Sequence, residues 1–354
     1  MDAALEDGIG IDGSNIFGAN VSSSDLVLIP DLTSFRRLPI YDSPHGNVAA
    51  FMCWVRNPDG TPAENCTRSV LRRELDNMVK LGFSKMNVGF EPEFFILKNP
   101  PSAGVYDKSI CLDDGRAYAS GAHDATDHIR REIMFELERA GIIPLTSHHE
   151  NAPSAYEITY KYSDAIRSCD NLILGMMITK EVARRHDMYA TFEPKPFDGV
   201  AGNGLHTNIS LEKAGKGVAG PSVNAFAGAG ADRLSPTARH FMAGVLNHAR
   251  GIVHLTNPTP ESYRRLVKGY QAPINICWGY SNRSTMIRVP NASGNGTRIE
   301  VRHPDSTMNP YLGVAGILRA GLDGIVNKTP LPEPADYNVW ESNDIPTLLD
   351  TEAK

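Results

Sequence analysis

The chain has 354 residues, enough to bury the core of one large catalytic domain or two ordinary domains without the help of disulfides. Its 35 Lys and Arg residues against 41 Asp and Glu residues form no long block of either sign, which argues against a surface for nucleic acid. The five cysteines are scattered without a C-x-x-C pair, the N-terminus is acidic, and every apolar run is too short to cross a bilayer. These features predict a cytoplasmic protein with reduced thiols and no membrane or nucleic-acid partner.

The first predicted elements are short β pieces between residues 8 and 35, broken by Gly and Ser. They indicate the remainder of a hairpin, and a linker is expected near residues 39–46. We therefore expect two parts, a partial N-terminal β segment over residues 1–35 and a catalytic domain over residues 36–354.

Helices and strands are predicted to alternate along the rest of the chain. Capping residues and a proline in the first turn place helix starts near Thr67, Asp124, Ser163, Ser235 and Asn309. Strand-like stretches lie at about 85–97, 143–150, 155–161, 204–211, 284–289 and 297–302. This mixture predicts an α+β fold in which helices cover one face of a sheet.

The stretch 85–97, KMNVGFEPEFFIL, is the most informative one. In a strand its even-numbered, mostly apolar residues would face one way, while Glu91 and Glu93 would face the other. Two carboxylates this close repel each other unless they are solvated or bridged by a cation, and a hard divalent ion with oxygen ligands is the natural bridge. A solvent-facing strand with two glutamates and no ligand explains this stretch equally well.

Three other segments carry similar groups on predicted strands. Glu150 and Glu157 lie on either side of a turn, His206 follows a Gly-Asn-Gly turn, and Glu300 stands between Arg298 and Arg302. Taken singly, each of them fits a surface ion pair or an ordinary structural residue. Together, five carboxylates, one imidazole and several arginines can hold two metal ions and a polyphosphate.

Six motifs in series resemble the signatures of the glutamine synthetase family. They are EPEFF, HHE, NGLHTNIS, RLVKGYQAP, SNRSTMIRVP and TRIEVRHPD with NPYL just after it. The resemblance covers the chain from about Asp12 onward. It implies a large antiparallel-sheet catalytic domain with helices on one face, like that of glutamine synthetases and guanidino kinases, preceded by a remnant of a β-grasp domain. It also implies that most of the β-grasp domain and the C-terminal helices are missing.

The same resemblance implies the activity of an ATP-dependent carbon–nitrogen ligase. Such an enzyme forms the γ-amide of glutamate with ammonia through γ-glutamyl phosphate, and it uses Mg²⁺ or Mn²⁺, two or more per site. Its partners would be glutamate, ATP and ammonia or another amine. The resemblance further implies a homo-oligomer with active sites between subunits.

Roles for single residues follow from the matched motifs. One metal site would comprise Glu93, Glu150 and Glu157, and the second Glu91, His206 and Glu300. Glutamate would be bound by Gly204, Arg265 and Arg302. Contacts to ATP would come from Asn208, Ser210, Arg283, Arg288 and Arg298, with Arg288 also neutralising charge on the transferred phosphoryl group. Asp12 resembles the aspartate that binds ammonium and helps to remove its proton.

One departure from the family pattern concerns the flap, which reads GYQAP where the family has GYEAP. Gln271 can donate and accept hydrogen bonds but cannot take up a proton. Three explanations are open: a slower glutamine synthetase, a relative that uses a larger amine such as methylamine or a polyamine, and a family member without catalytic activity.

Overall fold

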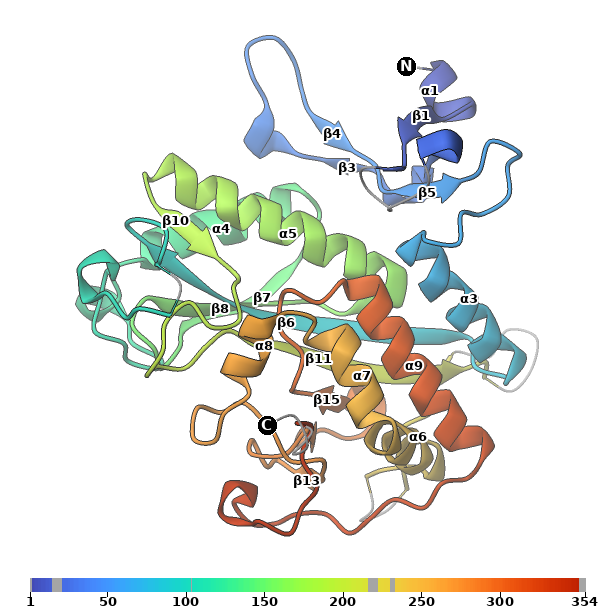
Figure 1. Ribbon diagram of the computed structural model, residues 1–354, viewed down its shortest axis with the longest axis vertical. Coiled ribbons are helices and arrows are strands. Elements are labelled where there is room, and N and C mark those ends of the chain that lie inside the picture. Colours follow the sequence, from blue (N-terminus) through green and yellow to red (C-terminus); the bar gives the residue numbers. More distant parts are fainter. Residues whose placement is uncertain (1, 15–20, 103, 216–221, 230–232, 350–354) are drawn as a thin grey trace.

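A ten-stranded sheet forms the centre of the computed structural model, which describes residues 2–14, 21–102, 104–215, 222–229 and 233–349 (Figure 1). The main path runs in the order β13, β14, β15, β11, β6, β8, β7, and β9, β10 and β12 add short edges. Among the named strands of this sheet in the described ranges, β13 and β14 pair in parallel and the other pairs are antiparallel. The strands are β6 (Lys85–Leu97), β7 (Pro144–His149), β8 (Ala155–Tyr160), β9 (Ser163–Asp164), β10 (Tyr189–Thr191), β11 (Leu205–Lys213), β12 (Val223–Asn224), β13 (Trp278–Tyr280), β14 (Ile287–Val289) and β15 (Ile299–Val301).

The five predicted helices are present, with two differences. The helix predicted to begin at Ser235 ends at Asn247 and is followed at once by a second helix, and the short helices Asp2–Glu6 and Pro260–Arg265 were not predicted. Capping explains two of the starts, because the Ser235 and Asn309 side chains accept hydrogen bonds from amides of the first helical turn. The helices are α3 (Thr67–Lys80), α4 (Asp127–Arg139), α5 (Ala165–Arg185), α6 (Pro236–Asn247), α7 (Ala249–Thr256), α8 (Pro260–Arg265) and α9 (Pro310–Val326). No helix in the described ranges combines the length and the apolar character needed to cross a membrane.

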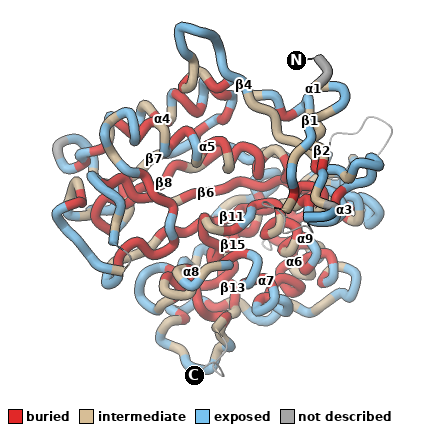
Figure 2. The backbone as a smooth tube through the Cα atoms, turned by 45° about the horizontal axis from the view of Figure 1, so that its top comes forward, coloured by how far each residue is buried: buried red, intermediate tan, exposed pale blue. Residues whose placement is uncertain are grey.

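Strand β6 has the two faces that its alternation predicts. Met86, Val88, Phe90, Phe94 and Ile96 join the main hydrophobic core, which also contains residues of α4, α5, α6, α7 and α9. Figure 2 shows β6, its neighbour β11 and β15 on the far side of β11 as the buried centre of the molecule. The helices thus cover the apolar face of the sheet, and the predicted α+β fold is confirmed.

The N-terminal region forms a smaller sheet of its own. β1 (Ile9–Asp12), β2 (Asp25–Pro30) and β5 (Cys53–Arg56) pair in this order, after the short α1 (Asp2–Glu6), while β3 (Arg36–Arg37) and β4 (Ala49–Ala50) form a separate hairpin. The chain leaves the small sheet after β2 and returns to it at β5. The expected division between residues 35 and 36 falls inside this excursion, and as a domain boundary it stays a prediction.

The expected linker near residues 39–46 is part of the packed structure. Leu38 and Ile40 are buried in the main core, because the short 3-10 helix Pro39–Tyr41 lies against α4 and α5. This segment therefore joins the hairpin to the catalytic part through apolar contacts rather than as a free connection.

Candidate active site

Strand pairing brings the predicted acidic residues together. Glu91 lies opposite His206 in the pairing of β6 with β11, and Glu93 lies opposite Glu157 in the pairing of β6 with β8. On the other edge of β11, Asn208 lies opposite Glu300. Because side chains of directly paired residues stand on the same face of a sheet, these groups share one face, opposite the helices.

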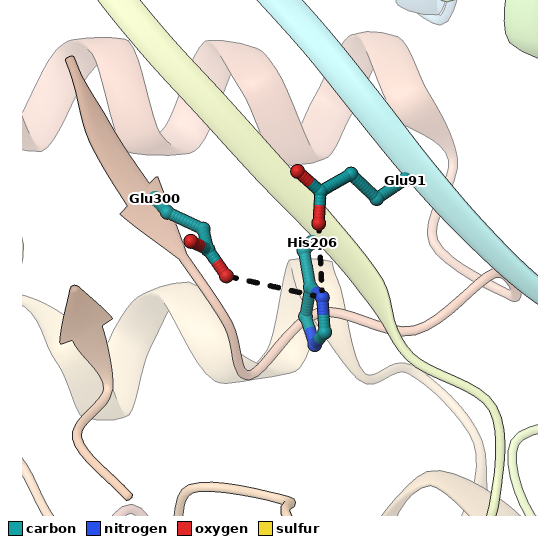
Figure 3. A group of neighbouring side chains, drawn as sticks. All are labelled: Glu91, His206 and Glu300. Atoms are coloured by element: carbon teal, nitrogen blue, oxygen red, sulfur yellow. Dashed lines mark ion pairs between the residues drawn. The ribbon is translucent and has the colours of Figure 1, made fainter. Parts of the chain in front are cut away.

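The first group of side chains is Glu91, His206 and Glu300, which come from three neighbouring strands and point toward one another (Figure 3). His206 Nδ1 lies 3.4 Å from Glu91 Oε2 and 3.9 Å from Glu300 Oε1. The Asn208 amide donates to Glu91 Oε1 at 2.8 Å and so fixes the orientation of that carboxylate. This is the set that the sequence assigned to the second metal.

A second group lies on the other side of His206. His206 Nε2 is 3.7 Å from Glu93 Oε1, and Glu93, Glu157 and His206 offer ligand atoms close enough for one ion. Glu150 reaches Glu157 in a third group, which also contains His148. Glu157 therefore belongs to one group with Glu93 and to another with Glu150. Each of these groups also contains a histidine, which the predicted set of Glu93, Glu150 and Glu157 did not include.

His148 is a candidate ligand that the sequence analysis did not name. Its Nε2 is 2.8 Å from Glu150 Oε1 and 3.9 Å from Glu157 Oε1, and its ring stacks on Tyr118. The sequence contained a signal for this ligand, because side-chain alternation along a strand places His148 and Glu150 on the same face.

The charges of the cluster account for opposite shifts in two pKa values. Burial and the negative charges of Glu91, Glu93, Glu150 and Glu300 raise the pKa of Glu157 well above its ordinary value. Burial also favours a higher pKa for Glu91, but the contacts of its carboxylate with His206 and Asn208 outweigh the effect of burial and lower the pKa to about 2. Carboxylate oxygens and imidazole in a crowded, negatively charged cluster suit a hard divalent cation, which would relieve the repulsion. The donor set therefore fits Mg²⁺ or Mn²⁺.

Two arginines neutralise the most buried of the acids. Arg288 and Arg302 both form ion pairs with Glu300, one with each carboxylate oxygen. Arg302 also has two buried nitrogen atoms, Nε and Nη2, with no hydrogen-bond partner among the described residues. Arg265 is buried beside it and donates to the carbonyl of His303 at 2.8 Å. Unsatisfied buried donors are costly, so this corner of the site is suited to an anionic ligand.

Gly204, predicted to contact the amino acid through its backbone, lies between these groups. Its amide donates to Glu93 Oε2 at 2.7 Å, and a Cβ atom here would come within 2.7 Å of Arg265 Nη2 and 3.2 Å of His206 Nε2. A side chain at position 204 would therefore occupy the space between the metal-binding groups and the arginine.

The flap residue Gln271 borders two cavities that share part of their walls. A small one of about 20 Å³, room for a water molecule or an ion, is also lined by Glu93, Glu150, His206 and Arg265. The adjoining cavity of about 250 Å³ has mostly small or apolar walls, among them Ala152, Pro153, Val200 and Ala201. Gln271 itself is exposed and has a left-handed backbone with φ of 60°.

A third, larger cavity of about 570 Å³ opens beside β6 and β11. Glu91 lines it together with the predicted nucleotide-binding residues Asn208, Ser210 and Arg298, and Arg298 Nε donates to Asn208 Oδ1 at 2.8 Å. Its walls include the aromatic residues Phe90, Tyr160 and Tyr162. The size is typical of ligand pockets, and the charged end lies at the carboxylate cluster.

Two predicted site residues lie apart from this cluster. Arg283 is exposed in the turn after β13 and does not line these three cavities. Asp12 belongs to β1 of the small N-terminal sheet, which pairs with β2 and not with the sheet that carries the carboxylates. Within a single chain, the cluster forms without them.

Comparisons with known proteins show the family of this chain. The model of "Glutamine synthetase, catalytic domain" matches residues 64–351, and that of "Glutamine synthetase, beta-Grasp domain" matches residues 1–58. The glutamine synthetases of Staphylococcus aureus and Staphylococcus epidermidis are each 41% identical over 367 aligned positions, which cover 100% of this chain and 80% of theirs.

Similar solved structures include a GmaS/ADP complex, with a TM-score of 0.86 and 31% identity over 98% of this chain and 79% of that one. The cryoEM structure of Plasmodium falciparum glutamine synthetase has a TM-score of 0.85 and 26% identity, covering 98% of this chain and 71% of that one. Since both family models match and the identity to curated relatives extends over the whole chain, this protein belongs to the glutamine synthetase family of ATP-dependent ligases.

Proposed function

We propose that this protein joins ammonia to the γ-carboxylate of glutamate, with ATP as the energy source and γ-glutamyl phosphate as the intermediate. The observation that carries this proposal is the convergence of Glu91, Glu93, Glu157, His206 and Glu300 beside buried arginines, between a nucleotide-sized cavity and the flap. An arrangement of this kind can bring a carboxylate and a terminal phosphate together.

The buried arginines are suited to bind glutamate. Arg302 has unsatisfied donors and Arg265 lines the small cavity, so their guanidinium groups can receive the α-carboxylate of the amino acid. We propose that the absence of a side chain at Gly204 keeps the approach between Arg265 and His206 clear for the amino acid, because a Cβ there would already lie 2.7 Å from Arg265 Nη2.

The nucleotide would occupy the 570 Å³ cavity, with its phosphates toward Glu91. Asn208, Ser210 and Arg298 would contact it there, and Arg288 would approach the transferred phosphoryl group from β14. Mg²⁺ or Mn²⁺ bound to the carboxylate cluster would supply positive charge to the phosphates. The residues of this chain hold the reacting carboxylate and phosphate side by side and keep the cluster out of bulk water.

The amine would enter on the flap side, where Gln271 lies. Ammonia at neutral pH is mostly ammonium, so its attack on the acyl carbon needs a group that first accepts a proton. Gln271 cannot serve, and Asp12 is not part of the cluster of its own chain. We propose that Asp12 reaches a site in a neighbouring subunit of a homo-oligomer.

A larger amine is the second candidate, and Gln271 is the observation that favours it. The cavity of about 250 Å³ next to Gln271 has Ala152, Pro153, Val200 and Ala201 among its walls, so an alkyl substituent would meet apolar surface. A γ-glutamyl alkylamide would then be the product.

An assay of ADP release tests both candidates. The full chain is incubated with ATP, glutamate, Mg²⁺ or Mn²⁺ and one amine of a panel: ammonia, methylamine, a longer alkylamine or a polyamine. Glutamate-dependent turnover that is fastest with ammonia supports the first candidate, and a higher kcat/KM for a substituted amine supports the second. No turnover with any amine in an assembled protein contradicts the ligase proposal.

A further inference from the structure

A single carboxylate outside the metal cluster braces the turn between Glu150 and Glu157. Asp113 lies in the loop after the 3-10 helix Lys108–Ile110, far in sequence from this turn. Its Oδ1 accepts from the amide of Ser154 at 2.8 Å and lies 2.9 Å from Nε2 of His149. Its Oδ2 accepts from the hydroxyl of Tyr156 at 2.6 Å.

Three partners of Asp113 stand next to the candidate ligands or between them, and a fourth, the amide of Gly115, donates to Oδ1 at 3.1 Å from within the same loop. His149 precedes Glu150, Tyr156 precedes Glu157, and Ser154 lies in the turn that connects the two strands. His149 and Tyr156 are fully buried. Nδ1 of His149 also lies 2.6 Å from the carbonyl oxygen of Glu150. The same imidazole ring therefore contacts both Asp113 and the backbone of a candidate ligand residue.

The turn itself has an unusual conformation that needs support. Ser154 is buried and has a φ of 62°, which is unfavourable for a residue with a side chain. The loop of Asp113 holds it on two sides, since Ser154 Oγ accepts from the amide of Leu112 at 2.7 Å. At Gly115 the loop passes so close that a Cβ would lie 2.7 Å from the carbonyl oxygen of Asn151.

We propose that Asp113 is a positioning residue that sets the distance between Glu150 and Glu157 and thereby the geometry of the metal-binding cluster. This inference rests on the proposed metal-dependent function. The amides of Ser154 and Gly115 and the hydroxyl of Tyr156 donate to Asp113, and a ring nitrogen of His149 faces it. A carboxylate with two accepting oxygens suits all of these contacts, whereas an amide would turn an NH₂ group toward a donor. Residues that orient ligands in this way affect metal affinity by about 10- to 100-fold.

The test measures binding of Mn²⁺ alone to the full chain, without substrates. Asp113→Asn should weaken Mn²⁺ affinity at least about 10-fold, measured by calorimetry and by the EPR signal of free Mn²⁺. Its kcat for ADP release should fall and recover in part at high Mn²⁺, which a merely structural defect would not show. Asp114→Asn is the matched control, because the neighbouring Asp114 is exposed and pairs with Lys108 on the surface.

A second variant guards against a folding defect. Tyr156→Phe removes one donor to Asp113 without introducing a new polar group, and it should weaken Mn²⁺ affinity in the same direction but less. A folded Asp113→Asn protein whose Mn²⁺ affinity is within two-fold of the wild type overturns the proposal. If Asp113→Asn does not fold and Tyr156→Phe does, an unchanged Mn²⁺ affinity in Tyr156→Phe overturns it as well. Wild-type protein that binds Mn²⁺ but shows no ligase turnover would refute the proposed function instead, and it leaves the role of Asp113 standing.

Discussion

Arg302 and Glu300 form an almost fully buried ion pair, with Nη1 of the arginine 2.5 Å from Oε1 of the glutamate. The same carboxylate also faces His206, so Glu300 serves as a counter-ion within the protein and as a candidate metal ligand. Removing one partner of a buried ion pair leaves the other charge uncompensated, which costs more than the pair itself contributes. Substitutions at this position therefore affect both folding and metal binding.

Glu300→Gln should separate these two effects. The amide oxygen can still accept from Arg302, so we expect a loss of about 1–3 kcal/mol in the free energy of unfolding, against about 3–5 kcal/mol for Glu300→Ala. Both variants should lose ADP-releasing turnover, because a neutral amide is a poor ligand for a hard cation. Urea unfolding in EDTA and the ADP assay measure the two quantities. A Glu300→Gln enzyme with wild-type turnover would contradict the assignment of Glu300 to the metal cluster.

Gln271→Glu tests what the flap contributes. A carboxylate at this position can accept a proton from a bound ammonium ion and so release ammonia as the nucleophile, and kcat/KM for ammonia should therefore rise about 10-fold or more relative to that for a larger amine. The side chain is exposed, so stability should change by less than about 0.5 kcal/mol. Gln271→Asn serves as the control, because it retains an amide and should not show the gain. An unchanged or lower rate with ammonia would mean that the flap has another task.

Arg68 connects the small N-terminal sheet to the helices of the catalytic part. Its Nη2 lies 2.8 Å from Asp31 and 2.9 Å from Asp170, and the Tyr311 hydroxyl also donates to Asp170. Arg68→Met should lower the free energy of unfolding by about 3–5 kcal/mol, since Asp170 is buried and would lose its cation.

Arg72→Met is the comparison for this position, because Arg72 is exposed on the same helix and both arginines approach the ring of Trp54, Arg68 at 4.0 Å and Arg72 at 5.8 Å. Urea denaturation followed by tryptophan fluorescence measures both variants. Equal free energies of unfolding for Arg68→Met and Arg72→Met would show that the Arg68 ion pairs do not stabilise the protein.

The contact between Asp113 and His149 predicts a pH dependence of stability. Although burial opposes it, contacts with His149, Tyr156 and the Ser154 amide lower the pKa of Asp113 to about 2, and its stabilising effect is lost as the pH falls from the ordinary value of 3.8 through about 2. Burial lowers the pKa of His149, but Asp113 and the Glu150 carbonyl raise it above the ordinary 6.5. That contribution is complete below pH 6.5 and is lost as the pH rises through the raised value.

The stability difference between the wild type and Asp113→Asn should therefore be largest between about pH 4 and 6.5 and shrink on both sides of this window. Urea unfolding in EDTA at several pH values between 3 and 9 measures it. Asp114→Asn should show no such profile. A difference for Asp113→Asn that is constant across this range would rule out the ion pair as its origin.

The sequence alone was sufficient where neighbouring residues decide the outcome. Alternation in β6 gave the correct core face from Met86 to Ile96, and Ser235 and Asn309 mark the true starts of α6 and α9. It also supplied the acids at Glu91, Glu93, Glu157 and Glu300, which the structure gathers with His206 into groups that could bind a metal. Periodicity and capping depend on residues a few positions apart, so they can be read along the chain.

Tertiary structure decided what depends on register and on contacts between distant segments. Strand pairing shows that His148 joins Glu150 and Glu157, and that Asp12 lies in a different sheet from the cluster of its own chain. The bracing of this turn by Asp113 has no sequence pattern, because the loop and the turn lie about 40 residues apart and meet only in the folded chain. Local sequence sets which face of a strand a side chain occupies, whereas the pairing of whole elements sets which side chains meet on that face.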